Sequence, residues 1–407
     1  MKICHTSDWH LGHRIHGQTR HEEHFQFLKW LITTLRQETV DVLLIAGDLF
    51  DTTTPNTRAQ ELYYRFLASA SQHGCRHIVI IGGNHDSPAF LDAPKRLLAA
   101  LQVHVIGAIG TDPEEEVLVL HAPDGQPELI VCATPFLRDR DIRLSEAAES
   151  MEEKSRKWIE GICGHYTRVL EIAMHKRRTL STTLPLVVMG HLFASGGRVC
   201  DGDGVRELYV GTLAQIPAGI FPVDEVDYLA LGHLHQAQQV GGQPNRRYSG
   251  TPLPMGFDEI GRQKSVSMIT FQGRQPSIEL REIPCFQELH RIQGDRTQIL
   301  AEVTQRIAAN SQAWLEIIHQ GPGLIGDLRT RLLDLAASSN LKILRIRDHQ
   351  SALTSFETDQ ELHLEELDEW MVFERCLEGH KIPEQERPGL RLAHREIVAA
   401  LSGQEPD

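Results

Sequence analysis

The chain has 407 residues and a formal net charge of −14, with 41% hydrophobic and 24% charged residues. This size and composition indicate two or three compact units, and no run of about 18 apolar residues is present that could cross a membrane. Because there is no apolar signal region and the seven cysteines form no Cys-x-x-Cys pair, we expect a cytoplasmic protein with reduced thiols and no membrane contact.

The first 280 residues alternate between strand-like and helical segments. Apolar residues recur at helical spacing over residues 20–37 and 57–73, and a polar helical stretch follows at Ser145–Arg178. This alternation predicts a catalytic α/β unit over residues 1–280. The strand-like runs, rich in aliphatic and β-branched residues, are Lys2–Thr6, Val42–Ala46, Ile78–Ile81, Leu186–Met189 and Tyr228–Leu231.

Residues 281–355 predict a small α/β unit of their own. The expected elements are a strand at Leu289–Gln293, a helix at Ile299–Ala309, a strand at Trp314–His319, a helix at Leu324–Ala337 and a strand at Leu341–Ile346.

Residues 356–407 predict a pair of helical segments separated by Pro383. Both segments have wide apolar faces that need to be covered. These faces either dock on the helices of a partner or pack back on the preceding unit.

Polar residues follow each of the five strand-like runs. The carboxyl ends of neighbouring strands lie together, and glycine lets the chain turn sharply there. Each block alone is a weak signal, since a lone Gly-Asp is usually a turn. Together they place costly polar groups against an apolar core, so we expect one shared pocket. The blocks are Asp8-Trp9-His10, Gly47-Asp48, Gly83-Asn84-His85-Asp86, Gly190-His191 and Gly232-His233-Leu234-His235.

These blocks offer carboxylate and amide oxygens and imidazole nitrogens, but no thiolate. Such donors suit Mn²⁺, Fe²⁺ or Zn²⁺ in a catalytic role better than a structural zinc site. Two ions roughly 3.5 to 4 Å apart that share a carboxylate activate water and clamp both oxygens of a displacement at phosphorus. The pattern therefore indicates phosphoester hydrolysis. The expected ligands, too many for one ion, are Asp8, His10, Asp48, Asn84, His191, His233 and His235.

The five blocks, in this order, resemble the signature of the calcineurin-like metallophosphoesterases. That resemblance implies a β-sandwich flanked by helices. It also implies that residues 281–355 form a capping domain and that residues 356–407 bind a partner ATPase. Four further segments resemble the nuclease subunits of bacterial complexes with a coiled-coil ATPase: residues 5–12, 46–51, 248–252 and 256–259.

The resemblance also implies a role for each metal ligand. Asp48 is expected to bridge two ions. The first ion would be held by Asp8, His10 and His235, and the second by Asn84, His191 and His233.

Three residues near the expected metals have other implied roles. In the family, the histidine that matches His85 stabilises the transition state and helps protonate the leaving oxygen. Asp86 either orients that imidazole or caps the turn ahead of Ser87-Pro88. Asp51 stands where archaeal and eukaryotic relatives carry histidine, and it is either a pocket residue or a surface acid.

The function implied by the resemblance is a DNA nuclease with two divalent ions, Mn²⁺ in the family, with Mg²⁺ as the other choice. It combines double-strand 3′–5′ exonuclease with single-strand and hairpin endonuclease activity in DNA repair, replication and recombination. The implied assembly is a homodimer within a heterotetramer in the bacterial cytosol. No ATP-binding motif is present. The alternatives are a phosphatase or phosphodiesterase with another substrate, and a scaffold without metals.

The net charge of −14 opposes a DNA-binding function, because proteins normally bind nucleic acid through Lys and Arg. Metal ions, dimerisation and the partner are expected to offset it. The apolar stripe of Tyr63, Phe66 and Leu67 is a candidate dimer surface. Arginines near the motif loops either contact the DNA backbone or are solvated surface charges: Arg14, Arg20, Arg138 and Arg140.

Overall fold

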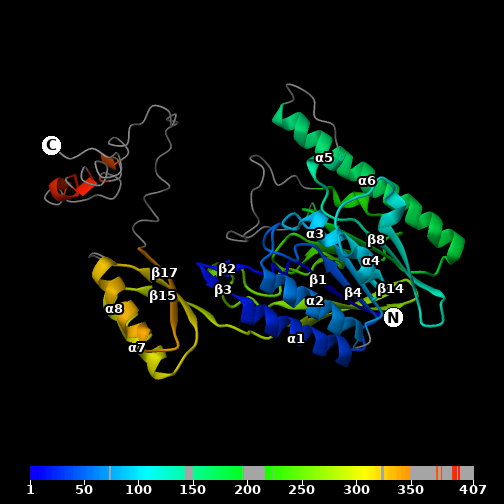
Figure 1. Ribbon diagram of the computed structural model, residues 1–407. Coiled ribbons are helices and arrows are strands. Elements are labelled where there is room, and N and C mark those ends of the chain that lie inside the picture. Colours follow the sequence, from blue (N-terminus) through cyan, green and yellow to red (C-terminus); the bar gives the residue numbers. More distant parts are fainter. Residues whose placement is uncertain are drawn as a thin grey trace. The chain divides into compact units, whose positions relative to one another are not determined.

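A computed structural model of the chain is shown in Figure 1. The described residues are 1–72, 75–142, 150–194, 196, 216–222, 224–321, 325–348, 373, 374, 377, 387–391, 393 and 394. The chain divides into two compact units, Met1–Glu288 and Leu289–Asp407. Within the described ranges, no helix combines the length and the apolar composition that a membrane span requires.

The first sheet of the larger unit is built around parallel strands that are apolar on both faces. Every residue of β4 and β5 is buried, as parallel strands covered on both sides require. The strand order is β14-β13-β1-β4-β5-β6, with β13 antiparallel to both of its neighbours. The strands are β1 (Lys2–Thr6), β4 (Val42–Ala46), β5 (His77–Ile81), β6 (Val103–Ile106), β13 (Ser265–Gln272) and β14 (Gln275–Glu282).

The second sheet has the order β11-β12-β10-β9-β8-β7. Its four central strands are parallel, and the two edge strands are antiparallel to them. All residues of β9 and β10 are buried. The strands are β7 (Val117–His121), β8 (Pro127–Ala133), β9 (Leu186–His191), β10 (Tyr228–Gly232), β11 (Gln238–Val240) and β12 (Gln243–Tyr248).

The two sheets pack face to face, and helices cover their outer faces (Figure 1). The core between the sheets contains Leu44 and Val79 of the first sheet and Val187 of the second. Helices α1 (His21–Gln37) and α2 (Thr57–Gln72) pack on the first sheet, and α6 (Met151–Leu180) packs on the second. The predicted β-sandwich flanked by helices is therefore confirmed.

Shorter elements connect these layers. The start of α6 is fixed by a capping box, in which Ser150 and Glu153 each accept the other's backbone N–H. The predicted start of this helix at Ser145 lies outside the described residues. The short elements are β2 (Arg14–Ile15), β3 (Gln18–Thr19), α3 (Pro88–Asp92), α4 (Lys95–Ala99), α5 (Asp139–Ile142), η1 (Pro113–Glu116), η2 (Ala218–Ile220) and η3 (Phe257–Glu259).

The apolar stripe of α2 is not a surface, so its prediction as a dimer interface is wrong. Tyr63, Phe66 and Leu67 are each no more than 2% exposed and belong to the core between the helices and the first sheet. The ring of Phe66 packs edge-on against Trp9, with the ring centroids 5.1 Å apart. A wide apolar stripe of this kind is what a helix needs to cover a sheet.

The second unit repeats a strand–helix pattern, and its elements follow the predicted order. A parallel sheet of order β15-β16-β17 has both helices on one face. Asp295 caps the first helix by accepting the N–H groups of Thr297 and Gln298. The elements are β15 (Leu289–Gly294), α7 (Arg296–Ala308), β16 (Trp314–His319), α8 (Ile325–Ala337) and β17 (Lys342–Asp348).

The predicted C-terminal helical pair, residues 356–407, lies mostly outside the described residues. The described residues on both sides of Pro383 are helical. Phe373 stacks on His394 with ring centroids 4.0 Å apart, and Arg391 donates to Glu374 at 2.7 Å. These two contacts join the two predicted segments to each other.

Phe66→Ala should lower the free energy of unfolding by about 3–5 kcal/mol, because it removes a buried ring and leaves a cavity. Urea denaturation measures this loss. Phe25→Ala on α1 is the control, since Phe25 is 36% exposed and its loss should cost about 0.5 kcal/mol or less. Dissociation of an oligomer by Phe66→Ala with unchanged unfolding energy would contradict the core placement.

Candidate metal centre

The five polar blocks come together at one end of the sandwich. Three of them follow β1, β4 and β5 of the first sheet, and two lie at the ends of β9 and β10 of the second. The side chains are buried, except for Asn84 and His233, which are half-buried. The predicted shared pocket therefore draws its residues from two sheets.

Glycines allow the two sheets to touch at this end. A Cβ atom on Gly232 would lie 1.9 Å from the carbonyl oxygen of Ala46, which no side chain could tolerate. A Cβ atom on Gly47, whose φ is +88°, would lie 2.3 Å from Nδ1 of His191. Any larger residue at either position would push the sheets apart and separate the ligands of one sheet from those of the other.

Four of the predicted ligands have backbone conformations that L-residues rarely adopt. The φ angles are 53° at Asp8, 45° at His10, 50° at Asp48 and 101° at His233. Such conformations cost about 1–3 kcal/mol each and persist only where the surroundings enforce them. Here, two hydrogen bonds join the first two blocks, from Asp8 N to Gly47 O at 2.9 Å and from His10 N to Asp48 O at 3.0 Å.

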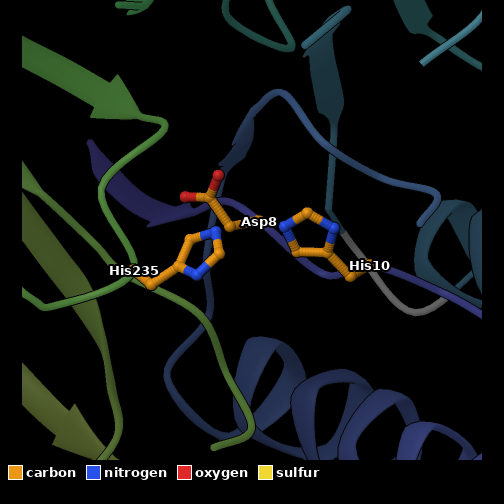
Figure 2. A group of neighbouring side chains, drawn as sticks. All are labelled: Asp8, His10 and His235. Atoms are coloured by element: carbon orange, nitrogen blue, oxygen red, sulfur yellow. The ribbon is translucent and has the colours of Figure 1, made fainter. Parts of the chain in front are cut away.

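Asp8, His10 and His235 form a compact group of donors (Figure 2). One ligand atom from each lies within 4.8 Å of the others. Neither ring nitrogen of His10 and not Nδ1 of His235 has a hydrogen-bond partner among the described residues, although all three are buried. Buried nitrogens without partners are costly, and a cation would satisfy them, so these residues fit a metal ion.

Asp48 lies between this group and the remaining predicted ligands. Its Oδ2 atom is 3.8 Å from Nε2 of His10 and 3.3 Å from Nε2 of His191. Oδ1 of Asn84 is 2.9 Å from Nε2 of His191 and 3.1 Å from Nδ1 of His233. Asp8, Asp48 and His191 also form a group within 4.8 Å. The predicted second set is thus brought together, next to the first.

Burial keeps three of the imidazoles neutral, which is the form that binds metals. It lowers the pKa of His10 well below its ordinary value, that of His233 to about 3 and that of His235 to about 4. Burial also raises the pKa of Asp8 to about 7.

Asp48 and His191 form a buried ion pair instead. Burial opposes both charges, but each partner's charge outweighs it, so the pKa of Asp48 is lowered and that of His191 is raised to about 9. Since Nδ1 of His191 donates to Ala46 O at 2.9 Å, the second proton sits on Nε2, between Asp48 and Asn84. A cation in the second set would replace this proton.

His85 is held by its neighbours with one ring nitrogen left over. Its Nδ1 donates to the carbonyl oxygen of Asp51 at 2.9 Å, and its backbone N–H donates to Oδ1 of Asp48 at 2.8 Å. Its ring lies against that of His10, with centroids 4.9 Å apart. The Nε2 atom is therefore the one left to act at the site.

Asp86 has a different contact from either one predicted for it. Its carboxylate accepts the backbone N–H groups of Gly83, Leu49 and Phe50 at 2.9 to 3.1 Å. Ser87, not Asp86, caps the following helix. Asp86 thus ties the loop after β5 to the loop after β4, and Asp51 rather than Asp86 orients the His85 ring.

Asp51 faces the pocket, and His13 is a neighbour that the sequence pattern missed. The Asp51 carboxylate is 3.6 Å from Nδ1 of His10 and 3.0 Å from Nδ1 of His13. All three residues line a cavity of about 470 Å³ together with His85 and His235. His13 follows no strand and belongs to no block, so only its position three residues after His10 hinted at the site.

The arginines near the loops differ in exposure. Arg20 is 1% exposed and pairs with Glu23, so both interpretations of it, as a DNA contact and as a surface charge, are wrong. Arg138 is half-buried and donates to the carbonyl oxygen of Asp86 at 3.0 Å. Arg14 and Arg140 are exposed.

A family model described as calcineurin-like phosphoesterase matches residues 1–237, and one described as type 5 capsule protein repressor C-terminal domain matches residues 285–381. The fold and the group of donors are those of a metal-dependent phosphoesterase, an enzyme of the hydrolase class.

The chain is also similar to curated proteins named as the SbcD component of the nuclease SbcCD. The relative from Escherichia coli K12 is 35% identical over 99% of both chains. Those from Rhodobacter capsulatus and Bacillus subtilis are 36% and 33% identical, over 67% and 66% of each chain. The chain belongs to the SbcD family of nuclease components, within the calcineurin-like phosphoesterases.

Metal binding should release protons, because His191 and Asp8 must both be unprotonated to act as ligands. With pKa values of about 9 and about 7, both carry protons near pH 7 in the metal-free protein. Roughly one proton per chain or more should leave at pH 7, and the number should fall as pH rises through 9. Calorimetric titration with Mn²⁺ in buffers of different ionisation enthalpy counts them. Release that is absent at pH 7, or that grows with pH, would contradict these protonation states.

Proposed function

We propose that the chain is a two-metal DNA nuclease and works as the nuclease subunit of an SbcCD-type complex. The observation that carries the proposal is the position of Asp48, between one group of unpartnered donors and a second group that shares a proton. In this proposal Asp8, His10 and His235 hold the first ion and Asn84, His191 and His233 hold the second, with Asp48 shared. Mn²⁺ is the metal we propose, with Mg²⁺ as the alternative, because the donors combine carboxylates and imidazoles without a thiolate.

When bound, a pair of divalent cations activates water and offsets charge on the phosphate. The residues of the chain supply the rest. Because Nδ1 of His85 donates to a carbonyl oxygen, a second proton on this ring must sit on Nε2. That proton can hydrogen-bond to a phosphate oxygen at the transition state and pass to the leaving oxygen. Asp86 holds the two loops that carry Asp48 and His85 in place, and it does not touch the reacting atoms.

The second unit carries a basic face that supports a nucleic-acid substrate despite the net charge of −14. Since Ile292, Leu315 and Ile317 pack under the helices, the alternate positions of the sheet point to its other face. We call this set the basic face: Arg291, Lys342, Arg345 and Arg347.

A single carboxylate lies among these cations. Glu316 is 2.6 Å from Arg291, 3.1 Å from Arg347 and 3.6 Å from Arg345. The side chains of Arg345 and Arg347 are 43% and 36% exposed, so they are accessible to solvent. Lys342 lies over the ring of Trp314 at 6.0 Å. Four cations around one acid form a surface that attracts phosphates.

The finer parts of the proposal are the substrate, the assembly and the place of action. We propose double-strand 3′–5′ exonuclease and single-strand or hairpin endonuclease activity in DNA end processing, repair and recombination. Residues 281–355 would act as a capping domain, and residues 356–407 would bind an SbcC-type ATPase. We further propose a homodimer within a heterotetramer in the bacterial cytosol. The relatives named as components of SbcCD support this assembly.

The experiment that tests the function compares two substrates. Purified chain should release nucleotides from linear duplex DNA in the presence of Mn²⁺, and it should turn over p-nitrophenyl phosphate much more slowly. Activity confined to the monoester would favour a metallophosphatase, which is the alternative that the same site supports.

His85→Gln should lower DNA hydrolysis by about 100-fold or more while metal content stays at the wild-type level, because the ring acts on protons and binds no metal. Elemental analysis after dialysis gives the metal content. His104→Gln is the control, since His104 is half-buried on β6 with one ring nitrogen lacking a partner among the described residues. Substantial cleavage by His85→Gln would remove His85 from the mechanism.

Arg345→Gln combined with Arg347→Gln should weaken DNA binding by the full chain and make its salt dependence less steep, by about 0.9 for each phosphate that is no longer bound. Fluorescence anisotropy across a range of salt concentrations measures both effects. Arg329→Gln with Arg331→Gln is the matched control, because it removes the same charge from exposed positions on α8. Equal effects of the two pairs would show that net charge matters and the basic face does not.

A further inference from the structure

The segment that supports the first set of donors lies beyond the phosphoesterase match at residues 1–237. We call residues 249–264 the support segment. They run from the end of β12 through η3 to the start of β13. Gly250, with φ +71°, brings the backbone so close that a Cβ atom there would lie 2.7 Å from the carbonyl oxygen of His235. The segment therefore rests directly on the chain that carries a predicted ligand.

One arm of the support segment reaches Asp8 through two hydroxyl groups. Ser7 Oγ donates to Oδ2 of Asp8, and Ser249 Oγ lies 2.8 Å from Ser7 Oγ. Because the single hydroxyl proton of Ser7 goes to the carboxylate, Ser249 must donate to Ser7. Both serines are no more than 2% exposed. Ser249 thus fixes the direction of the Ser7 hydroxyl, and Ser7 fixes the Asp8 carboxylate.

The other arm holds the backbone at His235. Thr251 N donates to His235 O at 3.0 Å, and Thr251 Oγ1 lies 3.4 Å from the same oxygen. Lys264 Nζ donates to Thr251 Oγ1 at 2.8 Å, and it pairs with Glu259 at 2.6 Å. Glu259 is 2% and Lys264 9% exposed. A buried ion pair therefore fixes the threonine that holds the backbone of the ligand.

The second set has supports of a different origin. His191 donates to Ala46 O, and Asp48 accepts the backbone N–H of His85. All of these residues lie within the phosphoesterase match. The hydrogen bonds of Ser249 and Thr251 lead instead to the first set, to Asp8 by way of Ser7 and to the backbone of His235.

We propose that the support segment positions Asp8 and His235 and thereby sets the affinity of the first metal site, leaving the second site unaffected. Ser249 and Thr251 are positioning residues, because they act through the ligands and do not touch the metal. The inference rests on the proposed two-metal site. Its test measures metal binding without DNA, so its failure is separate from a failure of the nuclease proposal.

The test uses Ser249→Ala and Thr251→Val in the full chain and keeps the Glu259–Lys264 pair intact, because a lone buried charge can unfold the protein. Titration calorimetry with Mn²⁺ gives the number and affinity of the ions. Electron paramagnetic resonance at limiting Mn²⁺ separates coupled pairs from single ions. Thr134→Val is the matched control, since Thr134 is fully buried and its hydroxyl has no partner among the described residues.

Each variant should bind one ion as tightly as wild type and the other roughly 10- to 100-fold more weakly, as expected when a supporting hydrogen bond to a ligand is lost. The coupled signal should give way to that of a single ion, and excess Mn²⁺ should restore it. Unchanged affinity for both ions would overturn the proposal, and so would an equal loss at both sites. A wild-type chain that binds no ion pair would instead refute the proposed two-metal function.

Discussion

The close approach of two sheets at one end of the sandwich is the constraint on which the site depends. Ligands from the first sheet and ligands from the second can meet only because Gly47 and Gly232 leave no side chain between them. The same contact lets Ala46 O accept a proton from His191. The loops that follow are then held in backbone conformations that residues such as Asp8 and Asp48 rarely adopt. The strain of these loops is maintained by the contact between the sheets.

Electrostatics at this end follow from burial. The polar side chains are removed from water, so most of the histidines are neutral, while one proton remains shared between Asp48 and His191. The metal-free site is therefore not a set of repelling charges, and it can fold before any ion binds. The basic face of the second unit shows the opposite arrangement, with an excess of positive charge on a chain whose net charge is negative.

Much of this arrangement could be predicted from the sequence, because buried parallel strands are continuous aliphatic runs and their polar ends stand out. The strand at Val42–Ala46 and the Asp48 that follows it are one example. The existence of two sheets could not be predicted, since periodicity reports that a strand is buried and not which strand lies beside it. The stripe of Phe66 showed that α2 buries one face, but not what that face meets. The contacts of His13, Asp86 and Thr251 are loop contacts, and no periodic pattern indicates them.

Crystals grown with excess manganese would test the pairing of two cations most directly, through anomalous scattering at the manganese edge. Two peaks roughly 3.5 to 4 Å apart should appear, one beside Asp8, His10 and His235 and the other beside Asn84, His191 and His233, with Asp48 touching both. A single peak, or two peaks that do not share Asp48, would contradict the two-metal site.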